Sequence, residues 1–324
     1  MKAITQDRYG STDVLEFRDV AEPVVGEKDV LVQVKGAGVD IGAWHVMAGK
    51  PYLIRVIGFG LRGPKVPGPG REIAGVVESI GTGVTRFKPG DEVFGTADGA
   101  FAEYASAPEE QLALKPKNLT FEQAAVVPIS GGTALQALRK GNVQAGQKVL
   151  IVGASGGVGS FAVQLAKAFG AEVTGVSSTA KMDLVRSLGA DDVIDYTRED
   201  FADGTRHWDL IIDAGGRRAL SHLRRALTRK GTLVVVGGEG GGAWLGGFDR
   251  NLRAGLVSMF VPQRLTMLAS KERGEDFDVL RELIEAGDVT PALDRTFPLI
   301  EAPDAISYVA DGRARGKVAI TVTA

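Results

Sequence analysis

The first 120 residues alternate short apolar runs with turn signals. Glycine and proline in Gly81-Thr-Gly83 and Lys88-Pro-Gly-Asp91 interrupt the apolar pattern, as they do between strands. Short runs at this spacing are typical of antiparallel sheets, so the pattern predicts an antiparallel, barrel-like region. The predicted strands are Val30–Val34, Ile73–Ile80, Glu92–Phe94 and Phe101–Ala105.

From about residue 122 continuous apolar runs alternate with amphipathic segments. Lys148–Val152 is typical of a buried parallel strand, and Gly157–Phe169 carries apolar residues at helical spacing. The later strands are predicted at Glu172–Val176, Asp192–Tyr196, Leu210–Asp213 and Thr232–Val236, with helices near Lys181–Leu188 and over Arg217–Leu227. Five strands joined by helices indicate a doubly wound parallel sheet.

The remaining residues mix both kinds of pattern. The predicted elements are a strand at Val257–Val261, a helix over Asp276–Ala286 and an alternating strand at Lys317–Val322. The length of 324 residues corresponds to about two domains at roughly 150 residues each. The fold class is therefore α/β with a second, antiparallel region.

Composition and charge exclude several classes of function. The chain has 38 Lys and Arg against 40 Asp and Glu, so no overall positive field favours nucleic acid or an anionic membrane. No apolar stretch is long enough to span a bilayer, and we expect a cytoplasmic protein. The absence of cysteine excludes disulfides, thiolate nucleophiles, iron–sulfur clusters and cysteine-bearing zinc sites. Redox chemistry would therefore need a bound cofactor.

The segment after Lys148–Val152 has the spacing of a dinucleotide site. It reads Ala154-Ser-Gly-Gly-Val-Gly159 and stands between an apolar strand and an amphipathic helix. Such glycines allow a tight turn, backbone approach to a pyrophosphate and close packing of helix on strand. A Walker-type site is excluded because no Lys-Ser/Thr follows, while glycines that only mark a turn are the bland alternative. The predicted cofactor contacts are Ser155, Gly156, Gly157 and Val158.

The end of the second predicted parallel strand favours NADPH over NADH. An NAD site usually has a carboxylate there, about 20 residues after the glycines, to bind the ribose 2′-hydroxyl. This chain has Ser177, Ser178 and Lys181 instead, and Glu172 lies at the other end of the strand. Small hydroxyls and a cation suit the 2′-phosphate of NADPH. The alternative is that Lys181 is only a solvated helix residue.

Four segments together resemble a known family: Gly70–Gly81, Gly83–Gly95, Gly153–Gly159 and Gly316–Val322. The chain resembles a zinc-independent member of the medium-chain dehydrogenase/reductase superfamily, close to the NADPH:quinone oxidoreductase group. The resemblance implies a Rossmann doubly wound parallel sheet inserted into a GroES-like β-barrel catalytic domain, with the substrate between the two. The implied divisions are 1–121 for the catalytic domain, 122–267 for the NADPH-binding domain and 268–324 for the return to the catalytic domain.

The resemblance also implies further cofactor contacts. Ser178, Lys181 and Tyr196 are implied neighbours of the 2′-phosphate, Thr133 matches a position at the nicotinamide end, and Gly237 is counted with the cofactor-binding residues. Homodimers are usual in similar families.

A zinc site is not predicted. Zinc-dependent relatives have a Cys and a Gly-His-Glu motif where this chain has Asp40 and Gly70-Arg71-Glu72. A set of Asp40, His45 and Glu72 stays conceivable, but Arg71 would place a positive charge near the ion.

Without a metal, easily reduced acceptors are favoured. No Tyr-x-x-x-Lys pair is present to protonate a simple ketone, whereas quinones and α,β-unsaturated carbonyls yield delocalised anions after hydride transfer. The expected partner is thus a small hydrophobic electrophile. Enoyl-thioester reduction, alcohol or aldehyde interconversion, and a non-catalytic NADPH-binding sensor or structural protein stay open.

Candidate residues for the substrate side come from the first region. Asp40 and His45 are the candidate catalytic donors, although an ionised aspartate cannot donate and His45 fits a structural role as well. Tyr52, in the apolar segment Pro51–Pro69, is the candidate substrate contact, and a short helix buried against the barrel is the alternative. Trp244, in the glycine-rich loop Gly237–Gly247, either closes over the cofactor or is exposed.

Overall fold

The computed structural model describes residues 1–324 apart from 67, 239–241, 243 and 324. By its internal contacts the chain forms two compact units. The first comprises Met1–Gly132, Glu272–Gly287 and Pro291–Ala324, and the second comprises Thr133–Lys271 and Asp288–Thr290. The sequence places the first division at 122, whereas the contacts place it inside helix α3 (Pro128–Gly141).

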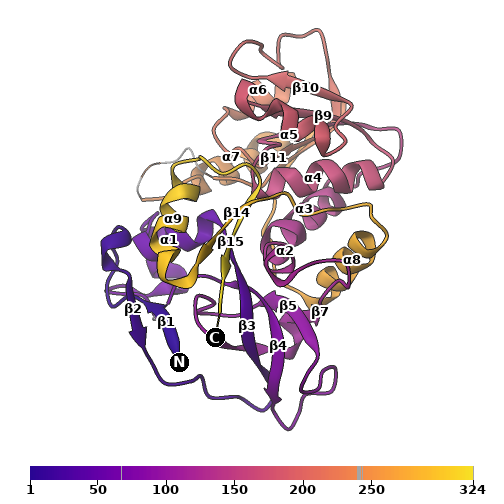
Figure 1. The fold of residues 1–324 in the computed structure, drawn as a ribbon. Coiled ribbons are helices and arrows are strands. Elements are labelled where there is room, and N and C mark those ends of the chain that lie inside the picture. Colours follow the sequence, from indigo (N-terminus) through magenta and orange to yellow (C-terminus); the bar gives the residue numbers. More distant parts are fainter. Residues whose placement is uncertain (67, 239–241, 243, 324) are drawn as a thin grey trace. The chain divides into compact units, whose positions relative to one another are not determined.

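The first unit is built on a mostly antiparallel sheet with the strand order β14-β15-β3-β4-β5-β7, and β6 also pairs with β3 (Figure 1). The C-terminal strand returns to the N-terminal part of the chain, since β15 pairs with β3 and places Val318 opposite Val39. The strands are β3 (Asp29–Val39), β4 (Glu72–Ile80), β5 (Glu92–Thr96), β6 (Tyr104–Pro108), β7 (Leu112–Leu114), β14 (Leu293–Pro298) and β15 (Lys317–Thr321).

The first unit also contains a second, smaller sheet and several helices. Strands β1 (Lys2–Thr5) and β2 (Glu16–Asp19) form a separate antiparallel pair. The helices are α1 (Ile41–Ala48), α2 (Phe121–Ala125), α8 (Gly274–Glu285) and α9 (Ala302–Ala310), with the short 3-10 helices η1 (Thr12–Val14), η3 (Glu109–Gln111) and η5 (Leu299–Glu301) and the short π-helix η2 (Arg55–Phe59).

Alternating apolar positions on β3 form the core of the first unit. Val30, Val32 and Val34 are at most 1% exposed and pack in one cluster with Ile73 of β4 and Ile306 of α9. The period of two therefore positions this sheet, as the sequence predicts. The strand predicted at Phe101–Ala105 begins only at Tyr104 and runs to Pro108, where it pairs with β3.

The second unit contains a parallel sheet with the order β10-β9-β8-β11-β12-β13. The chain moves outward from β8 through β9 to β10, then crosses back to the other side of β8 and continues outward through β11 to β13. This reversal makes the sheet doubly wound. The strands are β8 (Lys148–Val152), β9 (Glu172–Ser177), β10 (Asp192–Asp195), β11 (Trp208–Asp213), β12 (Leu227–Val235) and β13 (Arg264–Met267), and the helices are α4 (Gly157–Ala168), α5 (Met182–Ser187), α6 (Leu220–Arg225) and α7 (Phe248–Ser258), with the turn η4 (Thr179–Lys181).

The strand predicted at Val257–Val261 is wrong. The segment begins as the end of helix α7, and the strand that completes the sheet is β13. Ala254 is fully buried against the sheet, while Met259 and Phe260 are 68% and 84% exposed. A short apolar run does not distinguish a helix end from a strand, and here the helical period decides.

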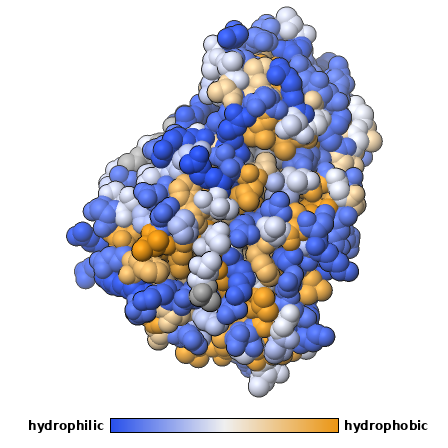
Figure 2. Space-filling view, in the orientation of Figure 1, coloured by the Kyte–Doolittle hydropathy of each residue, from blue (hydrophilic) through white to orange (hydrophobic). Residues whose placement is uncertain are grey.

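The hydropathy of the surface and the length of the helices are relevant to whether the chain could cross a membrane. On the face drawn in Figure 2, hydrophilic residues are interspersed with hydrophobic ones. Among the helices of the described residues, none has the length and apolar character needed to cross a bilayer.

Candidate functional site

The loop after β8 has the backbone of an anion cradle. Gly153 has a φ of +82°, a left-handed conformation that favours glycine. Gly156 caps α4 in an extended conformation, and no side chain caps the first helical N–H groups. A Cβ at Gly159 would lie 2.1 Å from the Gly153 oxygen, so only glycine lets the helix start this close to the loop. Ser155, Gly156, Gly157 and Val158 thus lie together at a helix N-terminus, where backbone N–H groups suit a phosphate.

Three loops meet at the carboxyl edge of this sheet. Asp213 at the end of β11 lies opposite Val152 at the end of β8. A Cβ on Gly153 would lie 2.9 Å from the Gly215 nitrogen, and one on Gly237 would lie 2.5 Å from the Ala214 oxygen. The Gly237 N–H also donates to the Asp213 backbone oxygen at 3.0 Å. This is the point where the strand order reverses, which is where open α/β sheets bind dinucleotides.

The residues expected at the ribose 2′-position lie on adjacent strand ends. Ser177 is opposite Asp195 in the pairing of β9 with β10, and the Tyr196 N–H donates to the Ser177 oxygen at 3.1 Å. The Lys181 N–H donates to the Ser178 oxygen at 3.0 Å and closes the turn η4. The structure therefore brings the predicted serines, lysine and tyrosine to one corner of the second unit.

Two residues of this corner were not found from the sequence. The Arg218 guanidinium lies 5.7 Å from the centre of the Tyr196 ring, which is 48% exposed. The buried Asp195 carboxylate accepts from the Thr179 hydroxyl and, at 2.7 Å, from the Thr197 hydroxyl. These hydrogen bonds, Thr179 first, hold the pKa of Asp195 below its ordinary value. Asp195 thus holds the segment after Ser178 in place through Thr179, and both hydroxyls already donate to its carboxylate.

Thr133 and Trp244 belong to other parts of the second unit. Thr133 lies in α3 and is 9% exposed. Trp244 is 74% exposed in a turn closed by a bridge between Gly242 and Gly246. Residues 239–241 and 243 of the glycine-rich segment lie outside the described residues.

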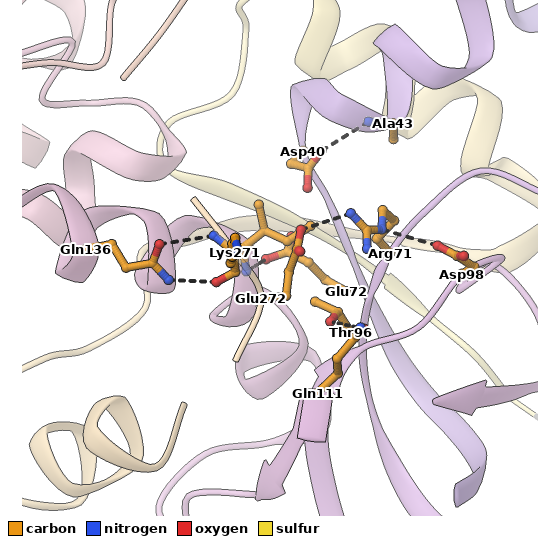
Figure 3. A network of polar contacts seen from close by, with 11 residues as sticks. Asp40, Ala43, Arg71, Glu72, Thr96, Asp98, Gln111, Gln136, Lys271 and Glu272 are labelled. Atoms are coloured by element: carbon orange, nitrogen blue, oxygen red, sulfur yellow. Dashed lines mark hydrogen bonds and ion pairs between the residues drawn. The ribbon is translucent and has the colours of Figure 1, made fainter. Parts of the chain in front are cut away.

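In the first unit, Asp40 and His45 are held by local contacts. Asp40 accepts a hydrogen bond from the Ala43 N–H at 3.0 Å and so caps helix α1 (Figure 3). The His45 ring nitrogen Nδ1 lies 2.7 Å from the Lys50 oxygen. Because a carbonyl oxygen only accepts, Nδ1 donates in this contact. The capping role makes Asp40 an acceptor here, and its catalytic role stays a prediction.

Tyr52 lies beside a guanidinium, shortly before the short helix η2. Arg55 stacks 4.8 Å from the Tyr52 ring and 4.4 Å from the Tyr9 ring. Val56 and Leu61 are 69% and 71% exposed, whereas Ile54 is 9% exposed, so the segment packs against the core only in part. The substrate-contacting role of Tyr52 stays a prediction.

A buried ion pair lies at the position of the altered metal motif. Glu72 is fully buried, and its Oε2 accepts from the Lys317 Nζ at 2.5 Å. Its Oε1 accepts from the Ile129 N–H at 2.9 Å. Burial raises the pKa of Glu72, and the Lys317 charge opposes that rise. Both oxygens of this carboxylate are therefore engaged by the protein.

Comparison with known proteins identifies the family. Residues 26–117 match the alcohol dehydrogenase GroES-like domain, and residues 188–320 match the zinc-binding dehydrogenase family. The chain is 35% identical to 2-methylene-furan-3-one reductase of Solanum lycopersicum over 99% of its length and 79% of that protein. It is 33% identical, with the same coverage, to the chloroplastic NADPH-dependent alkenal/one oxidoreductase of Arabidopsis thaliana. The quinone oxidoreductase structure from Coxiella burnetii superimposes with a TM-score of 0.86 at 28% identity, covering 100% of this chain and 99% of that one.

The chain belongs to the medium-chain dehydrogenase/reductase superfamily, in its quinone oxidoreductase-like group. The predicted combination of a Rossmann sheet with a GroES-like domain is confirmed. This medium-chain dehydrogenase/reductase is an oxidoreductase, as the sequence predicts.

The zinc implied by one family description does not fit the residues of this medium-chain reductase. Glu72 already accepts from Lys317 and Ile129, and Arg71 donates to Glu272 at 2.9 Å and lies 3.3 Å from Asp98 (Figure 3). In the part of the chain that the structure describes, no three His, Asp or Glu side chains form a metal-binding group. These residues therefore do not form a zinc site.

Proposed function

We propose that this reductase transfers hydride from NADPH to quinones or α,β-unsaturated carbonyls without a bound metal. The observation that carries the proposal is the glycine cradle at Gly153–Gly159 beside a corner suited to a 2′-phosphate. The likeness to alkenal/one, furanone and quinone reductases supports the class of acceptor.

The preference for NADPH rests on charge and hydroxyls at one corner. Lys181 and Arg218 provide cations, and Ser178 and Tyr196 provide hydroxyls, near the end of β9. The Ser177 hydroxyl is buried and donates to the Ser178 oxygen at 3.3 Å. The nearby carboxylate of Asp195 is already engaged by Thr179 and Thr197. A 2′-phosphate would therefore meet donors here, whereas the 2′,3′-diol of NADH would lack its usual carboxylate acceptor.

The proposed substrates are hydride acceptors that need little acid catalysis. Hydride addition to an enone or a quinone yields an enolate or a hydroquinone anion, which hydrogen bonds stabilise and water can protonate. In the structure Asp40 accepts a hydrogen bond at the start of α1, and His45 donates through Nδ1 to the Lys50 oxygen. NADPH supplies the hydride, and the protein's task is to bind and orient it.

A substrate panel tests the acceptor class. Purified protein is incubated with NADPH and a quinone, an enone, an enoyl thioester or a simple aldehyde, and oxidation of NADPH is followed by absorbance. We expect turnover with the quinone or the enone. Turnover with the aldehyde alone would refute the proposed class, and binding of NADPH without any turnover would favour a sensor.

The cofactor preference is tested by Lys181→Ala. Loss of a charged hydrogen bond to phosphate should weaken NADPH binding about tenfold to hundredfold and leave NADH binding nearly unchanged. Arg186→Ala, an exposed cation on the next helix α5, is the matched control. Equal weakening of both cofactors would remove Lys181 from the phosphate site.

Two predictions lie outside the site. The homodimer follows from the family resemblance and is tested by sedimentation of the purified protein. The cytoplasmic location is tested by fractionation of cells that produce it.

A further inference from the structure

Arg250 forms a buried ion pair at the carboxyl ends of the parallel strands in the second unit. It lies in the first turn of α7, and its Nη2 donates to Oδ2 of Asp213, the last residue of β11. The Asp213 side chain is fully buried, and the Arg250 side chain is 13% exposed. The other carboxylate oxygen of Asp213 accepts from the Gly216 N–H at 3.2 Å. The carboxylate is thus satisfied on both oxygens.

The Arg250 guanidinium, in contrast, has buried donors that lack a hydrogen-bond partner among the described residues. Nε and Nη1 of Arg250 are buried, and within the described residues they have no acceptor. Buried donors are nearly always paired in folded proteins because leaving one unpaired is costly. Two buried donors on one side chain that have no acceptor among the described residues therefore point to an acceptor supplied by a ligand.

The position of the pair indicates which part of a ligand lies near. Asp213 lies opposite Val152, after which the glycine cradle begins, and also opposite Val235 of β12. It stands on the β11–β13 side of the point where the strand order reverses. In a doubly wound sheet the first half, here β8–β10, binds the adenosine side of a dinucleotide, and the second half binds the nicotinamide side.

We infer that Arg250 donates hydrogen bonds from Nε and Nη1 to the nicotinamide nucleoside of the bound cofactor. Asp213 compensates the guanidinium charge, so the pair suits uncharged oxygen acceptors better than a phosphate. Ribose hydroxyls and the carboxamide oxygen are such acceptors. This inference rests on the proposed function, since it needs NADPH to bind, and it adds a positioning contact that the glycine cradle does not provide.

Truncated cofactors test the contact. The dissociation constants of NADPH, of 2′-phospho-ADP-ribose and of 2′-phosphoadenosine 5′-diphosphate are measured by calorimetry for the wild type and Arg250→Met. We expect NADPH to bind about tenfold to hundredfold more weakly to the variant, and the diphosphate, which lacks the nicotinamide nucleoside, to bind equally well. A loss shared by 2′-phospho-ADP-ribose assigns the ribose, and a loss with NADPH alone assigns the carboxamide.

Two further variants serve as a backup substitution and as a control for this test. Arg250→Lys keeps a cation beside Asp213 but not the guanidinium donors, so it should show the same selective loss if Arg250→Met fails to fold. Arg253→Met, an exposed position on the same helix, should bind all three ligands as the wild type does.

Two outcomes overturn the inference. Equal weakening of all three ligands would show a structural or phosphate role, and unchanged NADPH binding would show that Arg250 makes no contact. Failure of the wild type to bind NADPH would overturn the proposed function as well, and it is recognised because it precedes any substitution.

Discussion

Glu72 with Lys317 in the first unit, and Asp213 with Arg250 in the second, are both ion pairs removed from water. The carboxylate side chains are fully buried in both, whereas the cation is 1% exposed for Lys317 and 13% for Arg250. Neither Glu72 nor Lys317 has a buried polar atom without a partner among the described residues, but Arg250 has two. We call Glu72–Lys317 the closed pair, because its buried polar atoms all have partners among the described residues. We call Asp213–Arg250 the open pair, because two buried donors of Arg250 have none there.

The difference separates a structural use of buried charge from a binding use. Glu72 connects its own strand β4 to β15 through Lys317 and to the start of α3 through Ile129. Asp213 holds a guanidinium whose buried Nε and Nη1 have no acceptor in the part of the chain that the structure describes. A buried pair repays its desolvation only with good geometry and satisfied neighbours. The closed pair meets that condition by itself, and the open pair meets it when a ligand is bound.

The largest expected effect comes from breaking the closed pair by Lys317→Met. The fully buried Glu72 would lose its counter-charge, and removing one partner of a buried pair costs about 3–5 kcal/mol. Denaturant unfolding of the cofactor-free protein measures the change. The double variant Glu72→Gln with Lys317→Met carries no uncompensated charge and should recover most of the loss. A double variant as unstable as the single one would contradict this account.

The same variant should depend on pH in a definite direction. Burial already raises the pKa of Glu72 above its ordinary value of 4.5, and removal of Lys317 raises it further. A carboxyl group with a raised folded-state pKa favours the folded state at low pH, and that contribution is lost as pH rises through the folded-state pKa. The deficit of Lys317→Met should therefore be smaller at acidic than at neutral pH, and a deficit that shrinks as pH rises would refute the reasoning.

The open pair should cost less to break in the cofactor-free protein. Water can enter more easily at the partly exposed Arg250 than at Lys317, and Asp213 keeps its hydrogen bond from Gly216. We expect Arg250→Met to lower the unfolding free energy by about 1–3 kcal/mol. The same denaturant measurement applies, with Arg253→Met as the control on the exposed face. A cost equal to that of Lys317→Met would remove the distinction between the pairs.

Local patterns in the sequence predict the parts of the site that local backbone builds. The strand Lys148–Val152 and the helix from Gly157 are found at the expected residues, because apolar periodicity and glycine spacing act over neighbouring positions. The two buried ion pairs join residues 245 and 37 positions apart, so only tertiary packing brings their members together. Arg218 and Arg250 look like ordinary surface cations in the sequence. The helix end at Ser258 was missed because a short apolar run fits both periods.

An exposed pair gives the smallest effect and a reference for both buried ones. The Lys167 ammonium lies 2.8 Å from Asp191, with side chains 34% and 42% exposed. Burial tends to raise the pKa of Asp191, but hydrogen bonds from Lys167 and the Val173 N–H outweigh it and lower that pKa. A lowered carboxyl pKa stabilises the fold above the unfolded-state value and is lost as pH falls. Lys167→Met should thus cost only about 0.2–1 kcal/mol at neutral pH and reduce the acid sensitivity of unfolding, while Lys167→Arg keeps both. A loss as large as that of Arg250→Met would show that burial does not order these three pairs.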